Sequence, residues 1–232
     1  MTQGQAGLRR RLEAVEERIA RACARSGRRR DEVRLIAVTK TVGADRVREL
    51  FELGIEHVGE NRWQDAAPKW KLLGDRGTWH FIGHLQTNKV RDVLGRFSYI
   101  HSLDRMSLAL ELEKQGAKRG ITARCFVQVN VSGEESKHGL RPEELVPFIR
   151  EVSQFPHLHL VGLMTMAPAA DEPETVRPVF AGLRQLRDEL NSSGILARPM
   201  RELSMGMSGD FEVAIEEGAT WIRLGTALVG NE

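Results

Sequence analysis

The chain has 232 residues, of which 41% are hydrophobic and 28% charged, so it can bury one sizeable core, and we expect a single domain over residues 1–232. Its 34 basic and 32 acidic residues nearly cancel, which argues against nucleic acid or a membrane surface as a partner. Two cysteines outside any CxxC pattern, a polar start and no apolar run of membrane-spanning length predict a protein of the reducing cytoplasm.

Short apolar segments alternate with helical segments along the chain, after an amphipathic helix over residues 8–26. The predicted strands are residues 35–40, 55–59, 78–82, 99–102, 122–130, 159–164, 202–205 and 220–224. The predicted helices between them are residues 45–53, 64–73, 88–94 and 105–119, one beginning near Pro142, a long one ending at Leu190, and residues 210–217. This alternation is typical of a parallel sheet with crossover helices.

Eight strand–helix units predict an α/β fold, a single (β/α)8 TIM-type barrel, in which the first helix replaces the one missing after the last strand. A doubly wound open sheet is the alternative. That fold needs a glycine-rich turn after its first strand, and this chain has Thr39-Lys40-Thr41-Val42 there, which favours the barrel.

One lysine stands at the end of the first predicted strand. The apolar run before Lys40 should be buried, and the carboxyl ends of parallel strands are where ligands and chemistry collect. We expect apolar neighbours to desolvate Lys40 and lower its pKa, which makes it a usable amine nucleophile. The alternative is that Lys40 merely reaches solvent. Other residues expected at this mouth are Glu60, Asn61, His84, Gln86, His101, Asn130, Met164, Thr165 and Ser204.

Two small-residue turns follow the seventh and eighth strands. Residues 204–210 (Ser-Met-Gly-Met-Ser-Gly-Asp) precede a helix, and residues 223–226 (Arg-Leu-Gly-Thr) end the last strand. Backbone N–H groups at a helix start bind anions, and barrels commonly hold phosphate in this region. Tight turns that need glycine only for their conformation are the alternative. With Lys40, the turns favour a phosphorylated carbonyl ligand such as pyridoxal 5'-phosphate.

Two other kinds of site receive less support. His80 and His84 could join Glu60 and His101 around a metal ion, but no compact cluster with ligand spacing is present, so we expect no metal. Residues 25–30 form a basic run without aromatic residues between its arginines. We interpret this run as a solvated helix end, with nucleic-acid contact as the weaker alternative.

Several motifs resemble those of the pyridoxal phosphate homeostasis proteins, which are single-domain relatives of the alanine racemase barrel domain. The motifs are residues 37–40 (AVTK), 57–61 (HVGEN), 80–89 (HFIGHLQTNK), 204–208 (SMGMS) and 223–226 (RLGT). The resemblance runs from the first helix to the last residues.

The resemblance implies roles for individual residues. Lys40 would carry pyridoxal 5'-phosphate as an aldimine, and Arg223 would face the pyridine nitrogen. The phosphate would be held by Ser208, Gly225 and Thr226, with Asn61 and Met205 lining the site.

It also implies a carrier or buffer of the cofactor without catalytic residues, expected to be a monomer that contacts apo pyridoxal-phosphate enzymes only transiently. Racemases complete their site with a tyrosine from a second domain, whereas this chain ends at Glu232 after the eighth strand and has Tyr99 as its one tyrosine. The alternative function is a pyridoxal-phosphate-dependent racemase or aldolase. A metal-dependent barrel hydrolase is a third possibility.

Overall fold

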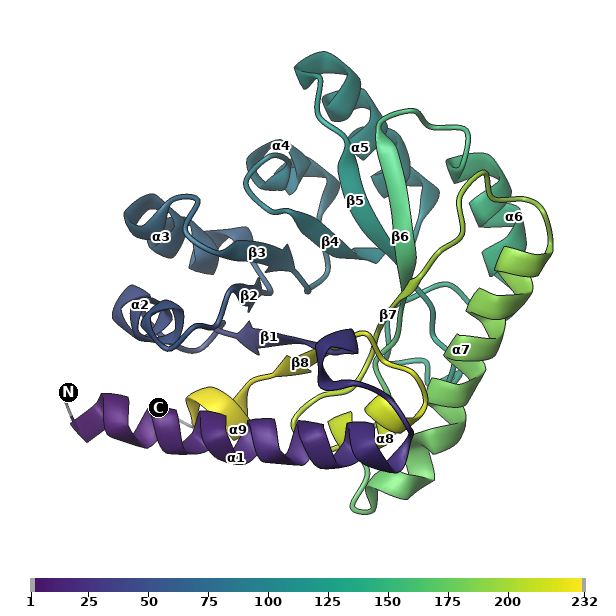
Figure 1. Ribbon diagram of the computed structural model, residues 1–232. Helices are drawn as coiled ribbons and strands as arrows, with labels where there is room; N and C mark the ends of the chain where they lie inside the picture. Colours follow the sequence, from purple (N-terminus) through teal and green to yellow (C-terminus); the bar gives the residue numbers. More distant parts are fainter. Residues whose placement is uncertain (1–2, 231–232) are drawn as a thin grey trace.

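The computed structural model describes residues 3–230, so residues 1–2 and 231–232 of the predicted domain lie outside the described part of the chain. Eight parallel strands close into a barrel in chain order, with helices around the outside (Figure 1). The strands are β1 Arg34–Val38, β2 His57–Glu60, β3 Thr78–Phe81, β4 Tyr99–Leu103, β5 Ala123–Gln128, β6 Leu158–Met164, β7 Glu202–Ser204 and β8 Trp221–Leu224. The predicted (β/α)8 barrel is confirmed.

The helices follow the predicted order with two differences. They are α1 Gln3–Arg25, α2 Ala44–Glu52, α3 Trp63–Leu73, α4 Val90–Val93, α5 Met106–Arg119, α6 Pro142–Val152, α7 Arg177–Ser192, α8 Phe211–Glu216 and α9 Thr226–Val229. The helix predicted over residues 88–94 is split into a 3-10 turn, Thr87–Lys89, and the single turn of α4. The short α9 was not predicted, and it begins directly after the last strand.

The barrel closes where the first strand meets the last. β1 pairs with β8 from Arg34 opposite Trp221 to Ala37 opposite Leu224. β1 ends at Val38. The Thr39 N–H makes one more bond to the β2 strand, at the Gly59 carbonyl, and the chain then turns, with the Val42 N–H bonded to the Thr39 carbonyl. This closure brings the chain after β1 beside the turn after β8.

Helix α1 covers the seam, as predicted, and lies along α8 and α9 (Figure 1). Its apolar stripe of Leu8, Val15 and Ile19 is buried. The basic run after it is solvated at Arg25 and Arg29, as predicted, but Arg28 is largely buried, which corrects the interpretation at that residue. Arg28 donates to the carbonyls of Ile215 and Ala219 at 2.7 and 2.8 Å, and so caps α8.

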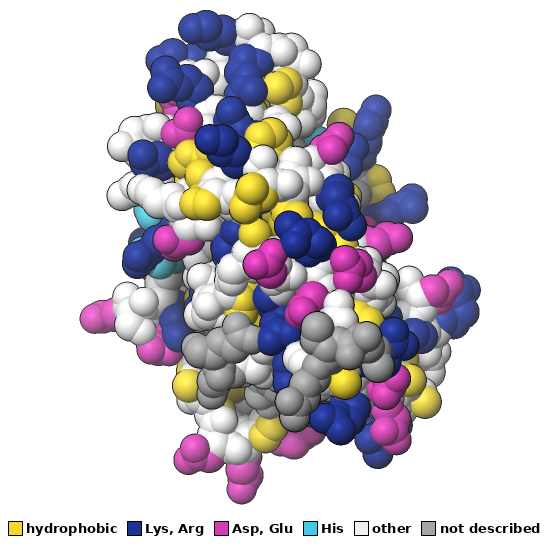
Figure 2. Space-filling view, turned by 90° about the vertical axis from the view of Figure 1, so that its left-hand side faces the viewer, with side chains coloured by type: hydrophobic (Ala, Val, Ile, Leu, Met, Phe, Trp, Pro, Cys, Tyr) yellow, Lys and Arg dark blue, Asp and Glu magenta, His cyan; other side chains and the backbone are white. Residues whose placement is uncertain are grey.

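The other arginines of this run take carboxylate partners. Arg30 forms a two-pronged pair with Glu16 at 2.8 Å per bond, and Arg25 bonds Glu216 at 2.6 Å. Figure 2 shows Lys, Arg, Asp and Glu side chains scattered together over one face. Within residues 3–230, none of the helices is both long and apolar enough to cross a membrane.

The interior of the barrel mixes apolar and polar side chains. Ile36, Phe126, Met164 and Trp221 come from four different strands and form one cluster, so they meet across the lumen. His80 and His101 are fully buried there as well. Met164, expected at the mouth, therefore lies in the layer below it.

Candidate functional site

A cavity of about 370 Å³ opens at the carboxyl ends of β1, β7 and β8, and we call it the first lobe. The residues that line it are Val38, Lys40, Thr41, Met207, Ser208, Gly209, Arg223, Gly225, Thr226 and Gly230. The predicted lysine, arginine and both predicted turns thus meet in one place, although almost 190 residues of sequence separate Lys40 from Thr226 (226 − 40 = 186).

A second lobe of about 380 Å³ lies beside the first and shares Val38, Lys40, Met207 and Arg223 with it. Its other lining residues are Asn61, Arg62, Ile82, Gly83, His84, Gln128, His138 and Met166. Gly83 is required here, because a Cβ at that position would stand 2.3 Å from the Asn61 carbonyl oxygen. Lys40 therefore stands at the junction of the two lobes.

Lys40 is exposed, which corrects the expectation of a desolvated amine. The reason is geometric, because β1 ends two residues earlier at Val38 and the turn carries Lys40 into the open mouth. The predicted burial of Lys40 is therefore wrong. The amine is instead placed within reach of both lobes.

A buried ion pair fixes the backbone immediately before Lys40. Glu60 is fully buried, and its Oε1 accepts from the Thr39 hydroxyl at 2.6 Å and from Lys69 Nζ at 2.7 Å. Lys69 also donates to the Thr39 carbonyl at 2.6 Å. Burial raises the pKa of Glu60 even though Lys69 pulls it down. Glu60 was expected at the mouth and instead holds the residue that precedes Lys40.

The two turns are joined by a hydrogen bond. Ser208 Oγ accepts from the Ala227 N–H at 3.3 Å, which ties the turn after β7 to the first turn of α9. Asp210 closes the first turn by accepting from the Met207 N–H at 2.6 Å. Gly206 has a φ of 94°, and a Cβ there would lie 2.7 Å from that of Ala214. Hydroxyls and helix-start N–H groups thus face one lobe, as an anion site requires.

Arg223 lies between the lobes and is only 3% exposed. Its Nη1 donates to Ser204 Oγ at 2.5 Å and its Nη2 to the Thr165 carbonyl at 2.9 Å. Burial lowers the pKa of Arg223 to about 10, so the guanidinium stays charged at neutral pH. Since a guanidinium has five N–H donors, three remain for a ligand.

A chain of histidines continues from Arg223 through the barrel. Ser204 Oγ lies 2.9 Å from His101 Nδ1, His101 Nε2 lies 2.9 Å from His80 Nδ1, and His80 Nε2 lies 3.1 Å from His57 Nδ1. Burial lowers the pKa of all three rings, which favours their neutral form. A neutral imidazole donates through one nitrogen and accepts through the other, so His80 and His101 can each pass on the hydrogen-bond chain. These hydrogen bonds place His101 and Ser204 beneath the mouth instead of in it. Thr165, whose carbonyl accepts from Arg223, lies beneath the mouth as well.

Met205 was predicted to line the site, but the structure places it in the core. It follows Ser204, which points into the barrel, so its own side chain points outward to the helical layer and is fully buried there. The methionine at the mouth is Met207, which is 36% exposed and touches both lobes.

Two more predicted mouth residues lie elsewhere. Asn130 is nine-tenths buried, and it bonds the Glu134 carbonyl and the Gly133 N–H within the loop after β5. Gln86 lines a separate cavity beside α3.

The sequence analysis missed several lining residues, notably Gln128 and His138. Gln128 stands at the end of β5, so its position was a signal. His138 lies in the middle of a loop and not at a strand end, so its sequence position gave no such signal. Gln128 Nε2 donates to its carbonyl at 3.0 Å.

Within the described residues, one set of side chains could hold a metal ion: His84, Asp104 and His138, with ligand atoms all within 4.8 Å of one another. The sequence analysis did not group them. Arg105 already pairs with Asp104 at 2.6 Å, and the two imidazole rings stack on one another at 4.7 Å. A metal grouping with Glu60 and His101 is not formed, because those side chains bond Lys69 and Ser204.

Sequence and structure comparisons agree with this geometry. The family model described as "Alanine racemase, N-terminal domain" matches residues 11–232. The chain is 47% identical over 222 residues to the pyridoxal phosphate homeostasis protein of Aquifex aeolicus, covering 95% of this chain and 96% of the relative. It is 42% identical to the protein of that name from Pseudomonas aeruginosa, over 93% and 92% of the two chains.

Among solved structures, PipY of Synechococcus elongatus with pyridoxal phosphate bound matches with a TM-score of 0.81 at 36% identity, covering 93% of this chain and all of that one. An alanine racemase of Clostridium difficile shares the fold, with a TM-score of 0.74 at 16% identity, and this chain covers 56% of it. The chain therefore belongs to the pyridoxal phosphate homeostasis protein family, built on the alanine racemase N-terminal barrel.

Proposed function

We propose that this chain binds pyridoxal 5'-phosphate at the two-lobed mouth, covalently through Lys40, and serves as a carrier or buffer of the cofactor. The observation that carries the proposal is the first lobe, which combines a primary amine, a buried guanidinium and two linked anion-binding turns. When bound, the cofactor supplies an aldehyde for a primary amine and a phosphate ester with two negative charges. The relatives named above support this assignment.

Each residue that lines the two lobes has its own role in the proposed site. Lys40 offers the amine at the junction of the lobes. Ser208, Gly225 and Thr226 offer hydroxyl and N–H donors to the phosphate. Arg223 offers its remaining N–H groups to the pyridine nitrogen, and Asn61 lines the second lobe. Met205 packs in the core between the barrel and its helices, away from both lobes, and has no direct role.

We propose further that the bound cofactor is held without turnover of amino acids. A charged guanidinium beside the ring nitrogen keeps that nitrogen unprotonated, which makes the ring a poor electron sink. Racemisation also needs proton-transfer groups on both faces of the substrate. Tyr99, the one tyrosine of the chain, lines a cavity at the amino-terminal end of the barrel. His84 and His138 are the remaining candidate bases in the second lobe.

The setting we propose is the cytoplasm, with a monomer that passes the cofactor to apo enzymes. Both cysteines, Cys23 and Cys125, are free and buried, which suits a reducing compartment. A mouth that leaves Lys40 exposed allows an incoming amine to reach the cofactor and displace it.

Borohydride reduction of the cofactor-loaded protein, followed by peptide mass mapping, tests the proposal. The pyridoxyl adduct is expected on Lys40, and Lys40→Ala should lose the visible absorbance. Lys114→Ala, an exposed lysine on α5, is the matched control and should keep it. An adduct mainly on Lys89 or Lys137 would overturn the assignment.

Turnover is tested separately by incubating the loaded protein with L- and D-alanine in deuterated water. We expect no α-proton exchange near enzymatic rates, which are about 1–10³ per second. Exchange at such rates would favour the racemase alternative.

A further inference from the structure

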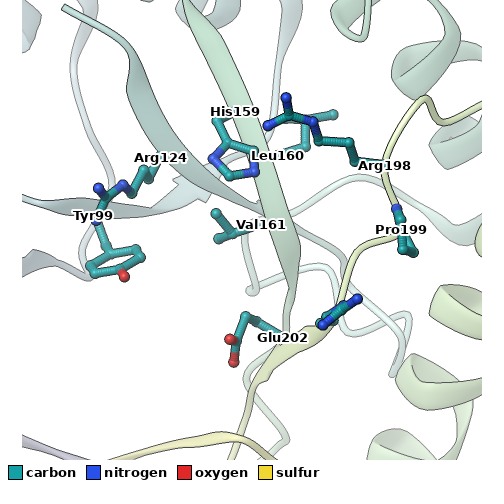
Figure 3. Close-up of a pocket in the computed structure, with 9 residues that line it drawn as sticks. Tyr99, Arg124, His159, Leu160, Val161, Arg198, Pro199 and Glu202 are labelled. Carbon is teal, nitrogen blue, oxygen red and sulfur yellow. The ribbon is translucent and has the colours of Figure 1, made fainter.

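A cavity of about 530 Å³ lies at the amino-terminal end of the barrel, opposite the mouth that holds Lys40. Figure 3 shows Tyr99 and Arg124 on one side of it, Arg198 and Pro199 on the other, and His159 and Val161 of β6 between them. Arg201 and Glu202, at the start of β7, complete the wall. None of these residues belongs to the cofactor site.

The wall carries positive charge that the rest of the described chain does not balance. Within residues 3–230, no carboxylate forms an ion pair with Arg124, Arg198 or Arg201. The one acidic residue of the wall, Glu202, is already occupied. Its oxygens accept from Arg34 at 3.1 Å and from the Trp221 indole N–H at 2.9 Å.

One contact and the placement of His159 between the two sides indicate that the charges face the same cavity. The guanidinium of Arg124 lies over the Tyr99 ring, 5.5 Å from its centre, which fixes it at the rim. Partial burial lowers the pKa of His159, and the nearby charges of Arg198 and Arg124 lower it further. Arginines from opposite sides of the cavity therefore act on the same imidazole.

Shape and charge together define the kind of ligand. The cavity is much larger than one phosphate group, and Tyr99, Leu160, Val161 and Pro199 give it an apolar floor. Arginine recognises phosphate and carboxylate groups with paired N–H donors. We propose that this cavity is a second binding site, for a small molecule that carries two or more phosphate or carboxylate groups and spans the arginines on its two sides.

Isothermal titration with inorganic pyrophosphate, citrate and inorganic phosphate tests the site. Pyrophosphate and citrate are expected to bind at least about tenfold more tightly than phosphate, because only they reach both sides. Arg124→Gln/Arg198→Gln should weaken pyrophosphate binding at least about tenfold while leaving pyridoxal phosphate binding unchanged. Comparing pyrophosphate with citrate distinguishes a phosphate ligand from a carboxylate one.

Matched variants separate this cavity from general surface charge and from the cofactor mouth. Arg9→Gln/Arg150→Gln removes the same charge from exposed helical positions outside both cavities and should bind pyrophosphate like the parent. Ser208→Ala/Thr226→Ala removes the two hydroxyls of the anion turns at the Lys40 mouth. This variant should keep the pyrophosphate affinity of the amino-terminal cavity unchanged. Arg198→Gln/Arg201→Gln should reproduce the loss independently. Equal affinity in all four variants, or no preference over inorganic phosphate, would overturn the proposal.

Discussion

Replacing Lys69 by methionine should strongly destabilise the barrel, because Lys69 is buried and pairs with a buried carboxylate. Lys69 lines neither lobe of the site. The side chain of Glu60 is completely buried and that of Lys69 is 9% exposed, at a separation of 2.7 Å. Lys69→Met keeps the apolar stem but leaves the Glu60 carboxylate without its counter-charge. It also removes the donor to the Thr39 carbonyl, next to Lys40.

The magnitude follows from the burial of the pair. Removing one partner of a buried ion pair costs about 3–5 kcal/mol, out of about 5–15 kcal/mol of total stability. For a chain of this size, the unfolding temperature should fall by roughly 6–20 °C. Lys69→Met/Glu60→Gln leaves no buried charge and should recover most of this loss, because uncharged replacements of similar volume avoid the desolvation penalty.

The stability loss of Lys69→Met should depend on pH, and the direction of this dependence follows from the pKa of Glu60. The pKa of Glu60 in the folded protein is raised by burial, and loss of Lys69 raises it further. A carboxyl group with a raised folded-state pKa favours folding at low pH, and this contribution is lost as pH rises toward the folded-state pKa. The deficit of Lys69→Met should therefore be smaller at pH 5 than at pH 8.

Urea unfolding monitored by circular dichroism at both pH values measures this deficit. Lys71→Met, at an exposed position on the same helix, is the control and should stay within about 0.5 kcal/mol of the parent. A loss below about 1 kcal/mol in Lys69→Met, or a loss independent of pH, would refute the reasoning.

Three other predictions follow from the site and the core. Thr226→Ala should weaken binding of pyridoxal phosphate by about 1.5–3 kcal/mol and leave pyridoxal binding unchanged in fluorescence titrations; equal losses for both ligands would mean that Thr226 does not contact phosphate. Gly162→Ala should destabilise the barrel by at least about 1–3 kcal/mol in urea unfolding, because its Cβ would meet the Glu202 carbonyl oxygen at 1.9 Å. Gly43→Ala has open space around its Cβ and loses only part of an N-cap preference, so it should cost less, about 0.5–1 kcal/mol. Burial raises the pKa of Cys125 to about 12, so it should resist iodoacetamide at pH 8 until the protein unfolds; rapid labelling of the folded protein would contradict this.

Residue patterns predicted the parts of this molecule that depend on local periodicity. The eight strands and the turns that carry Ser208 and Thr226 are of this kind, since strand ends in a parallel barrel share one mouth. Side-chain direction was harder to predict. Met205 and Met207 are two residues apart in one turn, and only the path of the backbone decides which of them reaches the cavity.

Properties that depend on contacts between different elements of the fold, or on where a strand stops pairing, were not predictable from the pattern. Glu60 follows an apolar segment, so the pattern predicts a residue at the mouth. In the structure Glu60 is buried, because it pairs with Lys69 of the next helix. The exposure of Lys40 depends on where β1 stops pairing. Likewise, His138 reaches the second lobe only because Gln128 holds its loop.

The seam between β1 and β8 has a consequence for folding kinetics. The proposed ligands of the cofactor come from the first strand and the last two, so the mouth is complete only after the most distant parts of the chain have met. Contacts of such large sequence separation form late and slowly. A ligand that binds only the closed ring stabilises the folded state by RT ln(1 + [L]/Kd) relative to every state in which the seam is open. Cofactor uptake by this chain therefore requires a closed barrel, and bound cofactor should slow the opening of the ring between β1 and β8.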